Sequence, residues 1–217
     1  MDLIHKVEGA SVHVMTNPLI TKADGTKFGK TEGGAVWLNP EMLSPYAFYQ
    51  FWLQTDDADV VRFLKIFTFL GREEIERLEA ATADNPRARQ AQRALAQEVT
   101  AWVHGAEALA QAQAATAALW GRGDLRELSA GTLAAATVSL PATELVVGES
   151  TVVDLLVGAG LERGRNAARK TVAAGGAYLN NVKVTDQEAT VGADDLLAGG
   201  VVLVRKGRRT LAVARTA

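Results

Sequence analysis

Two lysines that flank a glycine form a pattern that could do chemistry near the start of this sequence. They lie in the run Lys27-Phe28-Gly29-Lys30-Thr31, directly after an Asp-Gly turn and before an apolar, strand-like stretch. Two ammonium groups beside a glycine can hold a phosphate, because the glycine lets backbone N–H groups approach an anion closely. Five residues by themselves are also compatible with an ordinary solvated turn.

A second chemical pattern is a basic segment near the C-terminus. Arg163, Arg165, Arg169 and Lys170 lie on one short predicted helix or at its entry, and positions 165 and 169 share a helical face. Arginines on one face beside a hairpin can form a platform for RNA phosphates, where charge sets the affinity and shape sets the register. The alternative is a solvated basic face on a stable αβ domain.

The charge of the chain is distributed unevenly. The net charge of the 217 residues is −2, but residues 151–217 hold ten Lys or Arg against six Asp or Glu, a net of +4. The remainder carries thirteen basic against nineteen acidic residues, a net of −6. A basic tail on an acidic body indicates a polyanionic partner for the tail.

Composition excludes several classes of site. The absence of cysteine excludes disulfides, thiolate metal sites and a cysteine nucleophile. The three histidines, His5, His13 and His104, are far apart in sequence, so we expect no metal site. No apolar run approaches the roughly 20 residues of a membrane helix, and no signal peptide is recognisable, so we expect a cytoplasmic protein without membrane contact.

The elements that must position these residues fall into four regions. Residues 1–39 have strand-like alternation and turns, and their open edges suggest that the chain begins part-way through a larger domain. Residues 40–136 have helical periodicity and predict a compact bundle. Residues 137–150 read as a linker in which the run ELVV has an extended pattern. Residues 151–217 predict a small αβ unit.

Local signals place the elements inside the bundle and the αβ unit. In the bundle, Asn85 and Pro86 predict the start of a helix, and Gly105 predicts its exit. In the αβ unit, Asn180 and Asn181 predict a tight hairpin turn. A second hairpin is predicted around residues 206–209, and helices are expected over 151–161 and 163–174.

The C-terminal region resembles a known RNA-binding module. The order DLLVGAGLERGRNAARKTVAAGGAYLNNVKV is similar to the S-four-type module of a small-subunit ribosomal protein, pseudouridine synthases and bacterial tyrosyl-tRNA synthetases. The matching features are Leu155, Leu161, the arginine-containing helix, Gly176 and the hairpin. The resemblance implies that this region binds RNA.

The opening run resembles a loop of the class I aminoacyl-tRNA synthetases. That loop reads Lys-Met-Ser-Lys-Ser, and the form Lys-Phe-Gly-Lys-Thr is one that bacterial tyrosyl enzymes use. The surrounding segment, from PLITKADG to IFTFL, resembles the passage from the last catalytic strands into the helical anticodon-binding domain of that family. The resemblance implies an α+β multidomain protein with a remnant of a Rossmann-like catalytic domain, a helical anticodon-binding bundle and the small αβ RNA-binding module.

The resemblance also implies site roles and substrates. Lys27, Lys30 and Thr31 would be catalytic, because charge grows on the pyrophosphate of ATP as a carboxylate attacks its α-phosphate. Lys27, Gly29 and Lys30 would hold the ATP phosphates, with Mg in the full enzyme. The partner would be a tyrosine-specific tRNA.

The sequence lacks other features of the family. It has no His-x-Gly-His signature, and the segments for the tyrosine pocket and the dimer interface would lie upstream. We therefore expect the isolated chain to be monomeric and unable to activate tyrosine, since one wall of a site does not position its reactants.

Two further sets of residues leave alternatives open. Asp56 and Asp57 can accept hydrogen bonds from a guanine in the anticodon, but helix capping is the favoured interpretation. The aromatic residues at 48, 51 and 52 can stack on bases, but their spacing favours packing within the bundle. Tyr178 would stack on a base only if it were exposed. For the whole chain, the rival to a synthetase fragment is a stand-alone, non-catalytic RNA-binding adaptor.

Overall fold

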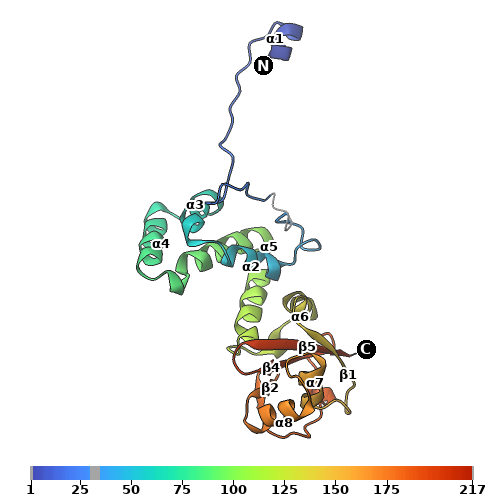
Figure 1. Ribbon diagram of the computed structural model, residues 1–217. Coiled ribbons are helices and arrows are strands. Elements are labelled where there is room, and N and C mark those ends of the chain that lie inside the picture. Colours follow the sequence, from blue (N-terminus) through green and yellow to red (C-terminus); the bar gives the residue numbers. More distant parts are fainter. Residues whose placement is uncertain (1, 30–34, 217) are drawn as a thin grey trace. The chain divides into compact units, whose positions relative to one another are not determined.

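The computed structural model describes residues 2–29 and 35–216 of the chain, which divides into two compact units, Met1–Val36 and Trp37–Ala217. The described residues form a mixed α/β protein with one five-stranded sheet. Figure 1 shows helices α2 to α6 followed by the sheet, with α7 and α8 beside it. No helix among the described residues is long and apolar enough to cross a bilayer.

The first unit contradicts the strand prediction for the start of the chain. Its described part contains helix α1 (Asp2–Glu8) and a single isolated β-bridge between Thr21 and Lys27. The alternating run SVHVM forms no strand, and its Val14 and Met15 side chains are 63% and 92% exposed. Alternation alone does not make a strand, because a strand needs a partner edge and a layer to cover its apolar face.

The helical prediction for the next region is confirmed. The helices of this region are α2 (Pro45–Leu53), α3 (Asp57–Phe67), α4 (Arg72–Asp84), η1 (Pro86–Ala88), α5 (Gln90–Leu119), η2 (Leu125–Glu127) and α6 (Ala130–Thr137). In α5, Gly105 has a φ of 85° and a ψ of 167°, so the helix is kinked where the glycine predicted an exit. The helix start predicted at Asn85 is confirmed only for a short helix: Asn85 is the N-cap of η1 with Pro86 at its first position, and it also ends α4. The long helix α5 begins only after Arg89, which adopts a left-handed φ of 48°.

Aromatic residues form much of the core of the helical elements. Phe48 and Trp52 on α2 are buried, and Trp52 contacts Phe63 of α3 edge-on with ring centroids 6.4 Å apart. The rings of Phe51 and Trp52 also meet edge-on, with their centroids 5.3 Å apart. The structure therefore supports the packing role predicted for the aromatic residues of α2.

The C-terminal region is an αβ unit, as predicted. Its elements are β1 (Ala142–Leu145), α7 (Val152–Gly158), α8 (Arg165–Ala173), β2 (Ala177–Leu179), β3 (Val182–Val184), η3 (Ala193–Asp195), β4 (Val201–Lys206) and β5 (Thr210–Thr216). The strand order is β1-β5-β4-β2-β3, and only the β1–β5 pair is parallel. Both predicted hairpins are present. Asn180 and Asn181 have φ values of 46° and 67°, which the tight turn between β2 and β3 requires.

The predicted linker is partly a strand of this sheet. Residues 142–145 form β1, which pairs with β5 in register from Ala142–Val213 to Leu145–Thr216. The linker prediction is therefore wrong for these four residues, and the extended piece starts two residues earlier than the run ELVV. The error arises because β1 is held by a partner about 70 residues away, which local composition does not reveal.

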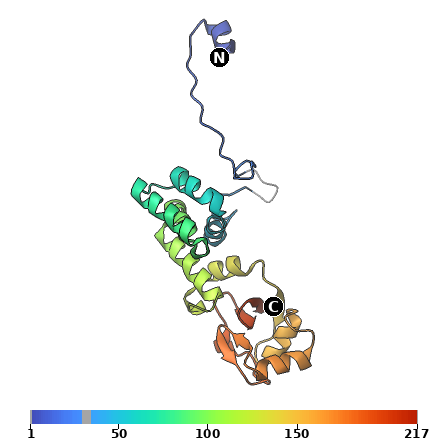
Figure 2. The ribbon, with the colours of Figure 1, turned by 60° about the vertical axis from the view of Figure 1, so that its left-hand side comes forward.

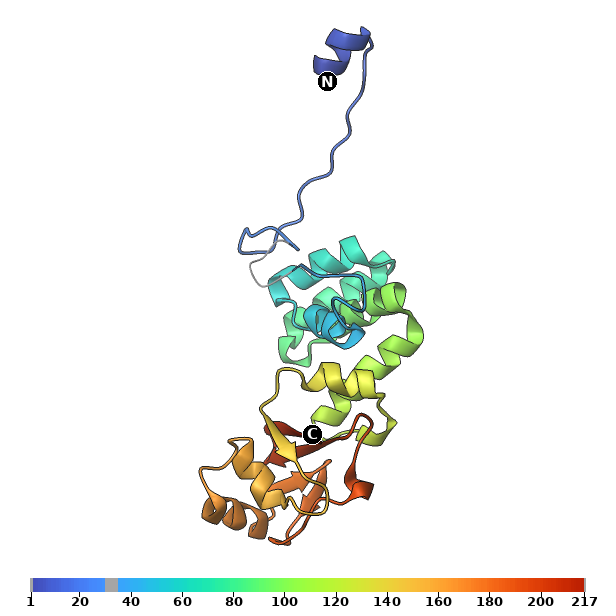
Figure 3. The ribbon, with the colours of Figure 1, turned by 90° about the vertical axis from the view of Figure 1, so that its right-hand side faces the viewer.

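The sheet is covered on both faces. Val202, Val204 and Ala212 point into a core shared with α7 and α8, whereas Leu203 and Val213 point into a core shared with α5 and α6. Figures 1 and 3 show α6 and the end of α5 on one side of the sheet and α7 and α8 on the other. Figure 2 shows α5 extending from the other helices to the sheet. The two cores explain why β4 is a continuous apolar run rather than an alternating one.

Candidate nucleic-acid interface

A tight turn presents the first lysine of the phosphate-loop pattern. Lys27 is exposed, and its backbone forms an isolated antiparallel β-bridge with Thr21. The backbone N–H of Phe28 donates to the carbonyl of Ile20 at 3.0 Å. Asp24 closes the turn by accepting hydrogen bonds from Thr26 N and Oγ1 at 2.9 and 2.6 Å. The hydrogen bonds from Thr26 lower the pKa of Asp24.

The rest of that pattern is only partly described. Gly29 adopts a φ of 73°, a conformation that favours glycine, so the chain turns sharply there. Lys30 and Thr31 lie outside the described residues. Their predicted roles in catalysis and phosphate binding therefore stay predictions.

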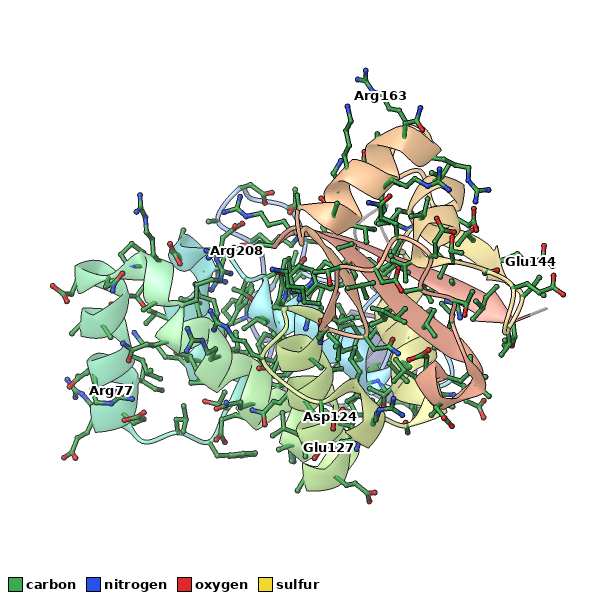
Figure 4. The ribbon with its side chains drawn as sticks, turned by 90° about the horizontal axis from the view of Figure 1, so that it is seen from below. Arg77, Asp124, Glu127, Glu144, Arg163 and Arg208 are labelled. Carbon is green, nitrogen blue, oxygen red and sulfur yellow. The ribbon has the colours of Figure 1, made fainter. Side chains whose placement is uncertain are left out.

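The basic residues of α8 and its entry lie on the surface of the αβ unit. Arg165 Nη1 pairs with Asp154 Oδ1 at 2.9 Å, and Arg169 Nη2 pairs with Glu188 Oε1 at 3.2 Å. Arg163 and Lys170 are exposed and have no ion pair within residues 2–29 and 35–216. Figure 4 shows Arg163 projecting away from the ribbon. Exposed pairs contribute about 0–1 kcal/mol, so the two paired arginines can exchange their carboxylates for phosphates at little cost.

Asp154 orients the N-terminal end of this basic surface. It forms a capping box with Thr151 at the start of α7 and also faces Arg165 and Arg169. Partial burial raises the pKa of Asp154, but hydrogen bonds from Thr151 and the charges of both arginines outweigh it, so the net shift is downward. Asp154 is therefore ionised at neutral pH and holds Arg165 on the α7 side of α8.

Glu162 fastens α8 to the sheet. Its carboxylate accepts a hydrogen bond from the Thr171 hydroxyl of α8 and pairs with Lys206 Nζ of β4 at 2.9 Å. Lys206 also donates to the carbonyl of Leu161 at 3.2 Å. The hydrogen bonds from Thr171 and Lys206 lower the pKa of Glu162. We call Glu162, Thr171 and Lys206 the α8 clasp.

The two aspartates predicted to read an anticodon occupy the start of α3. Asp56 is the N-cap residue, is exposed, and makes no side-chain capping hydrogen bond. Asp57 Oδ1 accepts from Nε2 of the fully buried Gln92 at 2.5 Å. The carboxylate of Asp57 therefore supports the packing of α3 on α5, whereas the carboxylate of Asp56 is available at the surface.

One face of the Tyr178 ring is covered by another side chain of the protein. The guanidinium of Arg205 lies over it, with Cζ 4.6 Å from the ring centroid. Tyr178 and Arg205 are directly paired across β2 and β4. Arg205 therefore occupies the ring face on which a base would stack on that side of Tyr178.

Sequence reasoning missed a groove lined by arginines. It lies where α5 meets the β4–β5 hairpin, has a volume of about 880 Å³ and is lined by no acidic residue among those described. Figure 4 shows Arg208 between the green helical elements and the red strands. We call this the junction groove, and its cationic and aromatic side chains are those of Tyr49, Arg93, Trp120, Arg122, Arg205, Arg208 and Arg209.

Part of the junction groove has a signal in the sequence. The hairpin tip reads RKGRR over residues 205–209, which is visible as a basic turn. Arg93 and Trp120 carry no such signal, because they lie more than 80 residues before the tip and reach the groove only through the packing of α5 on the sheet.

Comparison with known proteins shows the family. The family described as "tRNA synthetases class I (W and Y)" matches residues 1–121. The domain described as "Tyrosine--tRNA ligase SYY-like C-terminal domain" matches residues 132–214. The chain belongs to the tyrosyl-tRNA synthetase family. The resemblance predicted from the sequence is thus confirmed.

Individual relatives agree with this assignment. The chain is 55% identical over 214 residues to the tyrosine–tRNA ligase of Streptomyces griseus, covering 98% of this chain and 50% of that protein. It is 51% identical over 218 residues to that of Thermobifida fusca, covering 97% of this chain and 50% of that protein. The chain therefore spans about half the length of the curated relatives that it matches. A solved C-terminal domain of a tyrosyl-tRNA synthetase is 27% identical, with a TM-score of 0.37, covering 44% of this chain and 96% of that one.

The two matched stretches of the tyrosyl-tRNA synthetase family adjoin at the junction groove. Arg93 and Trp120 belong to the stretch that matches the class I family, and Arg205 and Arg208 belong to the stretch that matches the C-terminal domain. Arg122 lies between the two stretches. The groove is therefore built jointly by both parts.

Among the described residues, no group of three or more acidic or histidine side chains is placed to hold a metal ion.

Proposed function

We propose that this chain is the tRNA-binding part of a tyrosine–tRNA ligase. The observation that carries the proposal is the basic surface of α8, with exposed Arg163 and Lys170 and the weakly paired Arg165 and Arg169, on a module that matches the C-terminal domain of that family. Phosphates of the tRNA would replace Asp154 and Glu188 as partners of the two arginines. Charge would set the affinity and the shape of the RNA would set the register.

The proposal gives each region a role. Residues 1–39 would be the end of a Rossmann-like catalytic domain, residues 40–136 the anticodon-binding bundle, and residues 151–217 the S-four-type module. Because β1 belongs to the same sheet, the module would include residues 142–145 as well. Asp56, whose carboxylate is exposed at the start of α3, would be the contact to the first anticodon base.

In the whole protein, the reaction would have two steps. The tyrosine carboxylate would attack the α-phosphorus of ATP and release pyrophosphate, and the resulting tyrosyl group would then pass to the 3′-terminal ribose of the tRNA and release AMP. Lys27 and Lys30 would neutralise the charge that grows on the pyrophosphate, and Thr31 would hydrogen-bond one of its oxygens. Mg would enter with the ATP phosphates.

The proposal is tested by titrating the purified chain with a tyrosine tRNA transcript and with the same transcript changed at the first anticodon base. We expect binding to both, with weaker binding to the changed transcript, and we expect Asp56→Asn to reduce the difference between them. The double variant Arg163→Gln with Lys170→Gln should weaken binding to both transcripts equally. Failure of the chain to bind either transcript would refute the proposal.

A stand-alone RNA-binding adaptor is the second candidate, favoured by the basic surface alone. It predicts equal affinity for the two transcripts and for an unrelated structured RNA of the same length. A clear preference for the tyrosine tRNA would refute the adaptor.

A further inference from the structure

The junction groove concentrates positive charge without any negative charge of its own. Five arginines line it, from α5, the loop after α5 and the β4–β5 hairpin, and no Asp or Glu is among the described residues that line it. Like charges gathered at one site repel one another, so their arrangement favours a bound anion.

Arg205 carries a buried nitrogen without a hydrogen-bond partner among the described residues. The residue as a whole is only 9% exposed. No acceptor within residues 2–29 and 35–216 forms a hydrogen bond with its buried Nε. Buried charges in proteins are normally paired or hydrogen-bonded, because burial without a partner is costly. The ring of Tyr178 under the guanidinium supplies only partial compensation.

The backbone of Gly121, after the end of α5, lies close to the Arg205 guanidinium. A Cβ atom on Gly121 would lie 2.7 Å from Arg205 Nη1, and the φ of 75° at this position also favours glycine. The ring of Tyr178 and the Gly121 backbone therefore limit the space in which the guanidinium can move. A planar, pre-oriented guanidinium is suited to phosphate oxygens.

The groove also has an aromatic wall. Trp120 ends α5, is 61% exposed, and lines both the junction groove and an adjoining cavity of about 750 Å³. The adjoining cavity is also lined by Arg205, Arg208 and Arg209. An exposed indole ring beside arginines is the arrangement that binds a base by stacking and its phosphate by charge.

We propose that the junction groove binds one unstacked nucleotide of an RNA, with its phosphate against Arg205, Arg208 and Arg209 and its base on Trp120. This inference rests on the proposed function, because it takes the ligand to be RNA. It adds a site away from α8 that requires both the helical part and the C-terminal module. A nucleotide bound there would hold the two parts together.

The first test uses the tryptophan itself. The chain is titrated with the tyrosine tRNA transcript while tryptophan fluorescence is recorded, for the wild type, Trp120→Phe and Trp120→Ala. We expect quenching in the wild type, loss of that quenching with retained affinity in Trp120→Phe, and affinity at least about fivefold weaker in Trp120→Ala. Unchanged quenching in Trp120→Phe, together with unchanged affinity in Trp120→Ala, would overturn the proposal.

The second test counts phosphate contacts. The double variant Arg208→Gln with Arg209→Gln should lower the slope of log affinity against log salt by about 1 to 2. The matched control is Arg72→Gln with Arg87→Gln, which removes the same charge from exposed positions that do not line the groove. An equal change of slope in both double variants would overturn the site. Thermal melts of each variant confirm that it is folded.

Two further outcomes separate this inference from the proposed function. If Arg163→Gln with Lys170→Gln weakens tRNA binding while the groove variants do not, the proposed function survives and this inference fails. If the wild type binds no tRNA, both fail. A polyglutamate peptide that quenches Trp120 as strongly as a single-stranded oligoribonucleotide of equal charge would make the groove a site for acidic protein, and would overturn the nucleotide assignment.

Discussion

Replacing Lys206 by methionine should destabilise the chain at neutral pH and much less in acid. Lys206 Nζ lies 2.9 Å from the carboxylate of Glu162, whose side chain is 8% exposed, whereas that of Lys206 is 40% exposed. Methionine keeps the apolar stem of the lysine but removes its charge. Among the described residues, the Glu162 carboxylate then keeps the hydroxyl of Thr171 as its hydrogen-bond donor within the α8 clasp.

The size of the effect follows from how much of the pair is buried. Removing one partner of a fully buried pair costs about 3–5 kcal/mol, because it leaves an uncompensated charge. A fully exposed pair contributes about 0–1 kcal/mol. Glu162 is nearly buried but Lys206 is partly in water, so we expect a loss of about 1–3 kcal/mol in the free energy of unfolding at neutral pH.

Ionisation of Glu162 sets the sign of the pH dependence. Its pKa in the folded chain is lowered from 4.5, so its stabilising contribution is complete above 4.5 and is lost as the pH falls through the lowered value. In Lys206→Met this pKa rises, because a hydrogen bond and a positive charge are gone. Once the carboxyl is protonated in both proteins, the difference between them should largely disappear.

Urea unfolding, monitored by tryptophan fluorescence at about pH 7 and at about pH 3, measures the loss of unfolding free energy at neutral pH and its decrease in acid. The matched control is Lys170→Met, an exposed lysine of α8, which should change stability by less than about 0.5 kcal/mol. Glu162→Gln should lose stability at neutral pH and show a flatter pH dependence. A difference between Lys206→Met and wild type that is below about 0.5 kcal/mol, or that is equal at both pH values, would refute the reasoning.

Three other predictions follow from the fold and the site. Lys27→Ala with Lys30→Ala, made in the complete protein, should lower the rate of ATP–pyrophosphate exchange far more than the tRNA affinity; an unchanged exchange rate would remove the role of the loop. Leu203→Ala should cost about 2–5 kcal/mol in urea unfolding, because Leu203 is buried between the sheet and α5; a cost equal to that of the exposed Val182→Ala would contradict this packing. Asn181→Gly should cost about 1 kcal/mol, since glycine keeps the φ of 67° but loses the bond from Asn181 Nδ2 to the carbonyl of Ala118 at 2.7 Å; Asn181→Ala should cost more, because it loses that bond and also strains the turn.

The features that the sequence predicts correctly depend on neighbouring residues. The helices α3 and α4, the interruption of helical backbone at Gly105 and the turn at Asn180 and Asn181 are each specified within a few positions of the chain. Periodicity sets which face of a helix is buried, and a left-handed φ restricts a turn to a few residue types. The family resemblance has the same local origin, since its motifs are short runs such as KFGKT and YLNNVKV.

The features that the sequence does not reveal depend on residues far apart. The run SVHVM alternates but has no partner strand, and β1 lies in a stretch with linker composition but pairs with β5. Asn85 and Pro86 do start a helix, but it is the three-residue η1, and the left-handed Arg89 separates it from the long helix α5. Strand pairing and burial are long-range, so local propensity cannot decide them.

The sequence by itself determined the family, the helices after residue 40, the hairpins and the basic surface of α8, because each is encoded by residues adjacent in the chain or one helical turn apart. Only the tertiary structure decided that the sheet is covered on both faces and that the end of α5 meets the β4–β5 hairpin. That packing brings Trp120 to the arginines of the hairpin and leaves Arg205 buried without an acidic partner among the described residues. The physical reason is that a binding site is an arrangement in space, and packing of distant apolar faces creates arrangements that no local pattern contains.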